Sequence, residues 1–314
     1  MRPDAPDPAA EAPPAGESWR EAVATALRAT ARAGGERAIV TRQVGWSRIG
    51  GNALCSAWSL QDGASRYFVK IAAPSSAEML SAEADGLRAI GEARAVRVPE
   101  VVALGVAQGV AFLALEWLDI AHGGRDAALG RALAVLHAVT ARRHGWHRDN
   151  TIGPTPQRNG WADDWSEFFR DRRLAPQFAL AARNGYAGRL QRDGNALLDQ
   201  VAALLAGHAP KASLLHGDLW AGNAARLAGG EPAVFDPAAY YGDRETDLAM
   251  TELFGGFGSD FYAAYREAAP LDAGYGVRRT LYNLYHVLNH LNLFGAAYRH
   301  QAEAMVAELL SAVR

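Results

Sequence analysis

The chain has 314 residues, 49% of them hydrophobic, which exceeds one minimal core and suits a bilobal unit or two domains. Its 32 basic and 34 acidic residues leave a net charge of −2. The chain therefore lacks the excess positive charge typical of proteins that bind nucleic acid or an anionic membrane, and a small-molecule partner is favoured. The single cysteine, Cys55, excludes an intrachain disulfide framework and a cysteine-based zinc cluster, as expected in a reducing cytosol.

The N-terminal residues 1–17 are rich in Pro and Ala and lack the basic and apolar regions of a signal peptide, so we predict a disordered tail. The longest uncharged apolar stretch, residues 101–115, is interrupted by Gly105 and Gly109 and is shorter than the roughly 20 residues of a spanning helix. We therefore expect a cytoplasmic protein without a membrane span. The sequence does not indicate an oligomeric state.

The first ordered elements are predicted to be a helix over residues 19–32 and strand-like segments within residues 44–60. Gly50 and Gly51 lie between those segments, where a loop covering nucleotide phosphates would sit. Because the pattern does not match GxGxxG, an ordinary hairpin is the alternative. Cys55 follows directly, and we expect a small buried side chain there rather than a redox-active one.

A lysine on a strand and an acid on the next helix form the first candidate pair. The alternating segment around Lys70 predicts a strand, and residues 77–90 predict a helix with one apolar side. An ion pair between such a lysine and a helix glutamate positions the α- and β-phosphates in kinases. We predict Glu83 as the partner, with Glu78 and Asp85 as the competing acids.

Two further strands are predicted over residues 98–118, and backbone groups near Glu116 and Leu118 would meet an adenine in a kinase hinge. A helix follows over residues 131–139, in which we expect His137 to be a structural histidine rather than a catalyst.

Residues 145–174 combine Trp146, Trp161 and Trp165 with asparagines and aspartates. Such a segment either packs as a loop with bonded indoles or walls a pocket for a sugar or a cation.

The strongest pattern is Asp218, then Asn223 five residues later, then Asp236 after the apolar run 233–235. Phosphoryl transfer needs a carboxylate near the attacking hydroxyl and oxygen ligands for Mg²⁺ on the phosphates. We predict Asp218 as the base, Asn223 and Asp236 as Mg²⁺ ligands, and a strand-loop-strand hairpin carrying all three. Singly these residues are typical of turns, whereas their order and spacing indicate a kinase.

A lookalike sequence, His147-Arg148-Asp149-Asn150, is closer to the protein-kinase HRD pattern than His216-Gly217-Asp218 is. Five residues after Asp149 stands Pro154, which has no metal-binding side chain. The lookalike is therefore rejected on mechanism.

Two features follow the candidate metal ligand. Asp247 opens an apolar segment, which predicts an N-cap. A helix over residues 280–293 places Asn283, His286 and His290 on one face. These three either line a pocket or form a hydrogen-bonded structural network.

Four runs of this chain closely resemble the fructosamine kinase (ketosamine kinase) family, within the aminoglycoside and choline kinase superfamily. The runs are HGDLWAGNAA, FDPAAYYGDRETDLAMTELFGGF, LYNLYHVLNHLNLFG and RDNTIGPTPQRNGWADDWSEFFRDRRL. The resemblance covers roughly residues 45–314, and the tryptophan-rich run and the Asn/His helix are its most specific parts.

The resemblance implies an α+β, protein-kinase-like bilobal fold with ATP and Mg²⁺ as cofactors. Residues 18–118 would form a small antiparallel-sheet lobe with one key helix, and residues 119–314 a larger, mainly helical lobe. Phosphorylation of a ketosamine sugar hydroxyl, often at the 3-oxygen, destabilises the adduct and frees the amine. Trp220 would belong to the substrate pocket, with Lys70 and Glu83 on the phosphates.

Two alternatives remain open from the sequence. One is a kinase for an aminoglycoside, choline or another small molecule. The other is a non-catalytic nucleotide-binding protein, which is disfavoured because every catalytic position that we can name is filled.

Overall fold

The computed structural model describes residues 18–34, 44–51, 54–121, 123 and 125–313. The predicted tail, residues 1–17, lies outside the described residues. The chain divides into two compact units. The first runs to Glu92 and resumes over Val98–Asp119, and the second comprises Ala93–Arg97 and the chain from Ile120 onward.

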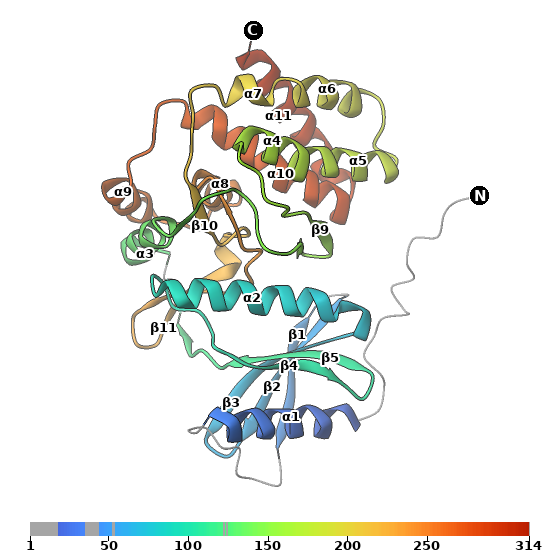
Figure 1. Ribbon diagram of the computed structural model, residues 1–314, viewed down its shortest axis with the longest axis vertical. Coiled ribbons are helices and arrows are strands. Elements are labelled where there is room, and N and C mark those ends of the chain that lie inside the picture. Colours follow the sequence, from blue (N-terminus) through green and yellow to red (C-terminus); the bar gives the residue numbers. More distant parts are fainter. Residues whose placement is uncertain (1–17, 35–43, 52–53, 122, 124, 314) are drawn as a thin grey trace, which may run out of the picture. The chain divides into compact units, whose positions relative to one another are not determined.

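The first unit is a five-stranded antiparallel sheet with the strand order β1-β2-β3-β5-β4. Helix α1 (Ser18–Gly34) lies along one face and α2 (Ala77–Ala93) along the other (Figure 1). The strands and the short 3-10 turn before α2 are β1 (Gly45–Gly51), β2 (Cys55–Asp62), β3 (Ser65–Ala72), η2 (Pro74–Ser76), β4 (Val101–Ala107) and β5 (Val110–Glu116).

Alternation along β3 decides which side chains reach each face. Tyr67, Val69 and Ile71 are buried in the core beneath α1, where they pack with Trp19 and other apolar residues of that helix. Because successive side chains of a strand point to opposite faces, Lys70 is directed to the α2 side. The predicted strand and helix in this part of the chain are therefore confirmed.

The second unit is mainly helical with three small antiparallel sheets, ordered β13-β10-β7, β12-β11-β6 and β8-β9. Its strands are β6 (Ile120–Ala121), β7 (Thr140–Ala141), β8 (Asn150–Ile152), β9 (Thr155–Gln157), β10 (Ala212–Leu215), β11 (Ala224–Leu227), β12 (Pro232–Val234) and β13 (Tyr240–Gly242). Its α-helices are α3 (Ala127–His137), α4 (Trp165–Phe169), α5 (Ala175–Arg183), α6 (Arg189–Leu198), α7 (Val201–Leu204), α8 (Glu245–Leu253), α9 (Ser259–Ala268), α10 (Tyr275–Phe294) and α11 (Arg299–Ala312). Shorter turns are η3 (Arg170–Leu174), which is π-helical, and the 3-10 turns η4 (Ala221–Asn223) and η5 (Ala296–Tyr298).

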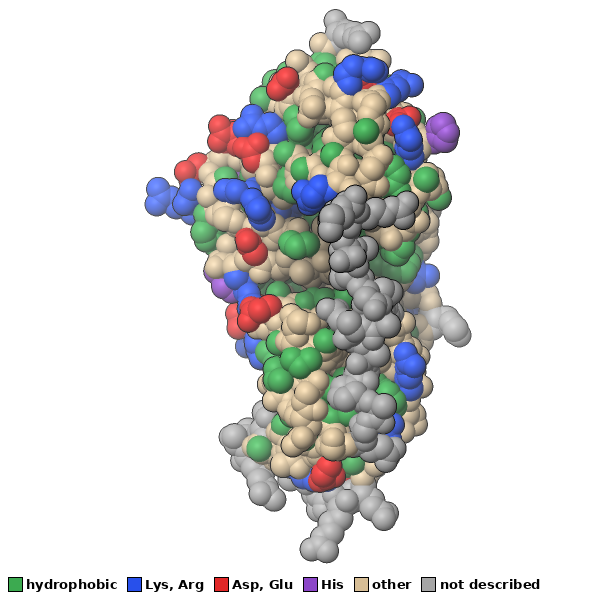
Figure 2. Space-filling model, turned by 90° about the vertical axis from the view of Figure 1, so that its right-hand side faces the viewer, with side chains coloured by type: hydrophobic (Ala, Val, Ile, Leu, Met, Phe, Trp, Pro, Cys, Tyr) green, Lys and Arg blue, Asp and Glu red, His purple; other side chains and the backbone are tan. Residues whose placement is uncertain are grey.

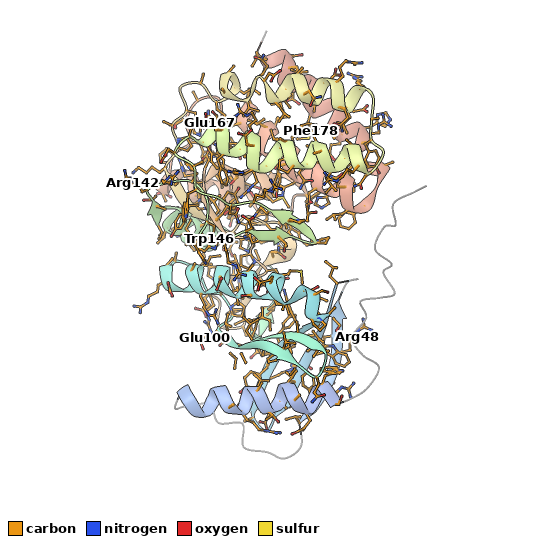
Figure 3. All side chains as sticks on the ribbon, turned by 45° about the vertical axis from the view of Figure 1, so that its right-hand side comes forward. Arg48, Glu100, Arg142, Trp146, Glu167 and Phe178 are labelled. Carbon is orange, nitrogen blue, oxygen red and sulfur yellow. The ribbon has the colours of Figure 1, made fainter. Side chains whose placement is uncertain are left out.

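Helix α10 is the central helix of this unit and packs against α5, α8 and α11. Close packing also joins α5 to α6. Phe178 of α5, labelled in Figure 3, is buried, and a Cβ added at Gly194 of α6 would lie 2.5 Å from its ring. This helical body supports the loops that carry the candidate site.

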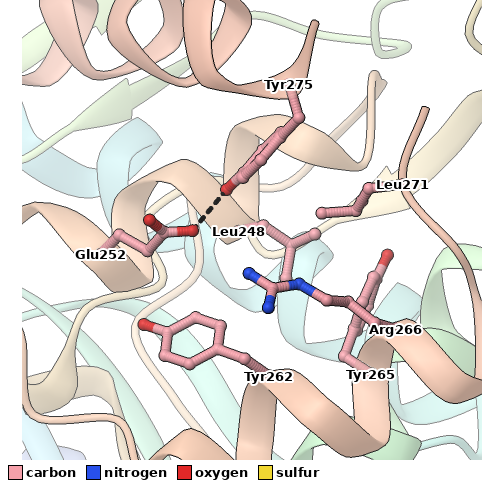
Figure 4. A pocket seen from close by; sticks show the side chains of 7 residues that line it. All are labelled: Leu248, Glu252, Tyr262, Tyr265, Arg266, Leu271 and Tyr275. Carbon is pink, nitrogen blue, oxygen red and sulfur yellow. Dashed lines mark hydrogen bonds between the residues drawn. The ribbon is translucent and has the colours of Figure 1, made fainter. Parts of the chain in front are cut away.

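A shallow depression between α8, α9 and α10 is lined by Leu248, Glu252, Tyr262, Tyr265, Arg266, Leu271 and Tyr275 (Figure 4). The space between these side chains does not admit a water molecule. The Tyr275 hydroxyl donates to Glu252 at 2.7 Å across it. These side chains therefore pack against one another and hold α8 in place, and the depression is not a ligand pocket.

The surface shows basic and acidic side chains interspersed on the face drawn in Figure 2. This mixture agrees with the near balance of 32 basic and 34 acidic residues. Within the described part of the chain, no helix is both long enough and apolar enough to cross a bilayer.

Candidate active site

Lys70 and Glu83 form the ion pair expected in the first unit. The Lys70 ammonium donates to both carboxylate oxygens of Glu83 at 2.8 Å, and the two side chains are only 13% and 14% exposed. Asp85, one of the competing acids, lies 3.5 Å from Arg88 instead. The geometry therefore selects Glu83, and the role of the pair toward a nucleotide stays a prediction.

We expect Lys70→Ala and Glu83→Ala each to impair turnover, and the double variant to lose less than the sum of the two losses. The reason is that both residues act through one ion pair, so the second substitution removes nothing further. A double-mutant cycle on kcat/KM measures this, with Asp85→Ala on the same helix as the control. Strictly additive losses would contradict the assignment.

Gly50 and Gly51 lie within the end of β1, paired with Ala57 and Ser56 of β2. Gly51 has φ +133°, and a Cβ there would lie 2.5 Å from the Cys55 carbonyl oxygen, so a side chain is excluded at this close approach. The expected position of both glycines in a loop is thus corrected to a strand end, because the β1–β2 pairing extends to Gly51. The Cys55 side chain is half-buried rather than fully buried. Asn52 and Ala53, which would complete the nucleotide loop, lie outside the described residues.

The predicted hinge residues follow the last strand of this sheet. Glu116 ends β5, and its carboxylate accepts a hydrogen bond from the Glu100 backbone at 3.2 Å. Leu118 lies two residues further along and is half-buried. Their part in adenine binding stays a prediction.

Asp218 lies in the loop between β10 and η4. Asn223 donates from Nδ2 to the Asp218 carbonyl oxygen at 2.9 Å and to its Oδ2 at 3.2 Å. His216 holds the start of the loop, because its Nδ1 accepts from Asp218 N at 3.3 Å while its Nε2 bonds the Phe235 carbonyl at 3.0 Å. Burial lowers the pKa of His216, which agrees with a neutral ring that accepts at one nitrogen and donates at the other.

Asp236 follows the end of β12 and adopts a left-handed backbone conformation, with φ +59°. Such a conformation is uncommon outside glycine and is tolerated best by Asp and Asn. Phe235 N donates to the Asn223 carbonyl at 3.1 Å, which joins the two predicted metal-binding positions. Gly217, with φ +81°, allows the loop that carries Asp218 to approach the segment after Asp236, since a Cβ there would lie 2.1 Å from the Ala238 carbonyl oxygen.

These contacts correct the predicted strand-loop-strand hairpin. The hairpin is β11–β12, with Asn223 before its first strand and Asp236 after its second. Asp218 instead follows β10, which pairs with β13 and β7. The three residues still gather, because the loop after β10 leads through η4 directly into the β11–β12 hairpin.

The ionisation of Asp218 is strongly perturbed. Burial and the neighbouring Asp236 carboxylate raise the pKa of Asp218 to about 7, although the hydrogen bond from Asn223 opposes the shift. A carboxyl group that titrates near neutral pH is suited to general acid–base chemistry.

Asp247 anchors the loop that carries Asp218, and its predicted role as an N-cap is wrong. Helix α8 already begins at Glu245, so Asp247 lies in its first turn, fully buried. Its two oxygens accept from His216 N at 2.7 Å and Gly217 N at 2.8 Å, and His137 Nε2 lies 3.2 Å away. Burial alone would raise the pKa of Asp247, but these hydrogen bonds and the neighbouring histidines lower it overall.

His137 is the structural histidine that we expected. Its Nδ1 bonds the Tyr265 hydroxyl at 2.8 Å and its Nε2 faces Asp247. Sequence analysis missed the link from His137 through Asp247 to the loop. The signal that could have found it is a charged residue within an apolar segment, since a buried carboxylate requires several partners.

The donor set at Asn223 and Asp236 fits Mg²⁺. The Asn223 amide nitrogen is engaged by Asp218, which leaves the amide oxygen as the atom for a cation, and Asp236 adds a carboxylate. Hard oxygen ligands of this kind suit Mg²⁺. The mutual repulsion of Asp218 and Asp236 that raises the pKa of Asp218 would also be relieved by a cation.

A second group of potential metal ligands, His208, Asp243 and Glu245, lies together in the second unit. Arg278 donates to both oxygens of Glu245 at 2.6 and 2.9 Å, so an arginine already neutralises this carboxylate. Asp243 also accepts from His208 at 2.6 Å. We interpret this group as a hydrogen-bonded structural network rather than a metal centre.

The tryptophan-rich segment is mostly packed. Trp146, labelled in Figure 3, is buried against Tyr241 at a ring distance of 5.3 Å. Trp165 is buried and donates to the Tyr282 hydroxyl at 3.0 Å. Trp161 stacks on Tyr241 at 6.2 Å and remains 39% exposed. Of the three indoles, Trp161 is therefore the one available to a ligand.

The lookalike motif takes part in a buried polar network. The Asp149 carboxylate accepts from Asn159 N at 2.8 Å, and Asn159 also accepts from Arg173 at 2.7 Å. Asn150 donates to the Ala239 carbonyl at 2.9 Å and so supports the backbone after Asp236. The fully buried Arg173 was missed from the sequence, because nothing local distinguishes it from the surface arginines beside it.

The predicted substrate residues occupy two settings. Trp220 is 41% exposed beside Asp218, with its ring against Gly222. On α10, Asn283 and His286 are buried, and Asn283 Oδ1 and His286 Nδ1 have no hydrogen-bond partner among the described residues. The part of both residues in a substrate pocket stays a prediction. His290 is half-buried and bonds the His286 carbonyl at 2.8 Å.

Comparison with known proteins identifies the family of this chain. Residues 30–312 match the family model described as fructosamine kinase. A probable ketoamine kinase of Synechocystis sp. is 45% identical over 83% of this chain and 89% of its own length. The chloroplastic protein-ribulosamine 3-kinase of Arabidopsis thaliana is 40% identical over 83% of this chain and 81% of its own length.

A solved structure shares the fold. The crystal structure of a Haemophilus somnus protein assigned as a fructosamine-3-kinase superposes with a TM-score of 0.82 at 28% identity, covering 91% of this chain and 97% of the other. The resemblance and the α+β, kinase-like fold predicted from the sequence are both confirmed. The chain belongs to the fructosamine kinase family.

Proposed function

We propose that this chain is an ATP- and Mg²⁺-dependent ketosamine kinase of the ribulosamine or fructosamine 3-kinase type. The observation that carries the proposal is the loop that joins Asp218 to Asn223 and places Asp236 beside them. The family and its ketoamine and ribulosamine kinase members support the substrate class. In this proposal the enzyme repairs glycated amines in the cytoplasm.

The reaction is a transfer of the γ-phosphoryl group of ATP to a sugar hydroxyl. As the hydroxyl oxygen bonds to the γ-phosphorus, the bond from phosphorus to the bridging oxygen breaks, ADP leaves and Asp218 accepts the hydroxyl proton. Asn223 keeps the Asp218 side chain oriented. Mg²⁺, held by Asn223 and Asp236, would supply charge neutralisation on the phosphates, and Lys70 with Glu83 would position them.

The neutral character of the acceptor residues favours a ketosamine over an aminoglycoside. Burial lowers the pKa of His286 to about 3 and also lowers the pKa of His290, so both rings are neutral near pH 7. Together with Trp220 and Asn283 they offer stacking and neutral hydrogen bonds, which suit a sugar chain that carries hydroxyl groups and a single amine. An aminoglycoside carries several ammonium groups and calls for a cluster of carboxylates.

We expect kcat/KM for ribulosamine or fructosamine compounds to exceed that for kanamycin by at least roughly tenfold, about 1.4 kcal/mol in transition-state binding. ADP release in excess Mg²⁺-ATP measures kcat/KM for both substrates.

Trp220→Ala should reduce ketosamine turnover more than basal ATP hydrolysis. A higher kcat/KM for kanamycin or choline would refute the ketosamine proposal while leaving a kinase, and nucleotide binding without any turnover would refute both.

A further inference from the structure

An exposed aromatic cluster surrounds His290 at the C-terminal end of α10. The His290 ring lies 4.8 Å from Phe254, 5.2 Å from Phe294 and 5.1 Å from Tyr298, measured between ring centres. Phe254 is 42% exposed and Phe294 is 66% exposed. We call these four residues the aromatic rim. A cluster of exposed aromatic rings in mutual contact is typical of a surface that binds a ligand or another protein.

The aromatic rim is tied to the catalytic loop through Arg125. Phe254 follows α8 and leads into Gly255 and Gly256, and the Gly256 carbonyl accepts from Arg125 Nε at 2.7 Å. The same guanidinium donates to the Ala221 carbonyl at 3.1 Å. A Cβ added at Gly256 would lie 2.6 Å from the Ala221 Cβ. The segment that carries Phe254 therefore abuts the residue directly after Trp220.

His290 contributes a neutral hydrogen-bond acceptor to the aromatic rim. Because its Nδ1 lies 2.8 Å from the His286 carbonyl, which can only accept, the proton is on Nδ1 and Nε2 is left as an acceptor. No group in the described part of the chain bonds that Nε2. Three aromatic rings and one neutral acceptor complement a cation that carries N–H groups.

Glu252 lies on α8 two positions before Phe254, and its carboxylate is already engaged by other groups. Glu252 accepts from the Tyr275 hydroxyl at 2.7 Å, as Figure 4 shows, and from Arg279 at 2.6 Å. Its charge is thus already matched by an arginine. A single ammonium group on an alkyl chain fits these surroundings better than a polycation.

We propose that the aromatic rim binds the amine-bearing arm of the ketosamine, whose secondary ammonium donates to His290 Nε2 and lies against the rings. This inference rests on the proposed function. The amine of a ketosamine is attached two carbons from the 3-hydroxyl, so a sugar placed at Asp218 directs its alkylamine outward from the loop. The deeper Asn283 and His286 would then serve the sugar hydroxyls, and the aromatic rim would select for the charged arm.

The test compares two substrates that differ at one atom, which bears both the positive charge and the N–H donors. One is the ribulosamine of butylamine, and the other is its ether analogue, in which oxygen replaces the amine nitrogen. Wild-type protein should prefer the ammonium compound in kcat/KM. Phe294→Ala should reduce this preference by about 2- to 5-fold, the loss expected for one exposed cation–π contact. The KM for ATP should not change.

Phe294→Leu separates charge recognition from apolar contact. Leucine keeps apolar area but has no π face, so its preference should fall as far as that of the alanine variant. Val135→Ala on α3, where Val135 is 56% exposed, is the control and should match wild type. All of these positions are exposed, so the variants should fold with unchanged Tm.

Three results would overturn the inference. If wild type turns over the ammonium compound but neither Phe294 variant alters the preference, the aromatic rim does not bind the arm and the proposed function stands. If the leucine variant alone retains the wild-type preference, the ring faces do not sense the charge. If wild type turns over neither compound, the proposed function and this inference fail together.

Discussion

Asp218→Asn is expected to lower kcat by about 10²- to 10⁴-fold, the range for removal of a general base. The amide cannot accept the hydroxyl proton, while its size preserves the loop. The KM for ATP should change little, because Asp218 acts on the attacking hydroxyl rather than on the nucleotide. Steady-state ADP release with a ribulosamine measures both constants.

The same substitution should not lower the free energy of unfolding. Burial and Asp236 raise the pKa of Asp218 to about 7, so its ionised form is disfavoured in the folded protein. An acid with a raised folded-state pKa reduces stability above its unfolded pKa, and removing its charge therefore maintains or increases stability near neutral pH. Thermal unfolding of the two proteins without ligand checks the sign.

Asp149→Asn is the matched control, since it makes the same chemical change in the lookalike motif. Its kcat should stay within about threefold of wild type, because only a transition-state contact gives a large loss. Retention of more than about a tenth of wild-type kcat by Asp218→Asn would refute the assignment of the base. Loss of activity in Asp149→Asn alone would transfer that role to the rejected motif.

Local patterns in the sequence predicted the structure correctly where neighbouring residues determine it. Alternation identifies β3 and directs Lys70 away from the α1 core, and helical spacing then places Glu83 on the helix that covers the other face. The spacing of Asp218, Asn223 and Asp236 reflects the chemistry itself, which explains why the motif was informative although its secondary structure was misassigned.

Features that depend on contacts between residues far apart in the sequence could not be predicted. The partners of β10 are β13 and β7, which lie far from it in sequence, so no local pattern distinguished them from a hairpin with β12. The N-cap prediction for Asp247 failed for the same reason. An N-cap side chain bonds the backbone of a residue close to it in sequence, whereas the actual partners of Asp247, His216 and Gly217, are 31 and 30 residues away.

Asp247→Asn is the second substitution with a large expected effect, and it should reduce both stability and kcat. Each Asp247 oxygen accepts from one backbone N–H of the catalytic loop, and an asparagine can present only one oxygen to the two donors. A buried donor left unsatisfied costs about 1 to 3 kcal/mol. Displacement of the loop that carries Asp218 should also lower kcat, since small misplacements of a catalytic group are costly.

A matched control separates stability from catalysis. Asp164 caps α4, because its carboxylate accepts a hydrogen bond from Glu167 N at 2.8 Å. Asp164→Ala should therefore cost about 1 kcal/mol of stability. At temperatures where this variant is still folded, its kcat should equal that of wild type. If Asp247→Asn loses stability but keeps wild-type kcat at such a temperature, then Asp247 supports the fold alone and does not position Asp218.

The pH dependence provides an independent check on Asp247. Its pKa in the folded protein is lowered, so its carboxylate contributes stability that is complete above the unfolded pKa, near 4, and is lost as the pH falls through the lower folded value. The difference in unfolding free energy between wild type and Asp247→Asn should therefore be greatest at neutral pH and shrink on acidification. Urea unfolding at a series of pH values measures this difference. A difference that grows toward acid pH would mean that the Asp247 carboxylate is protonated in the folded protein, which contradicts its role as the double acceptor that anchors the catalytic loop.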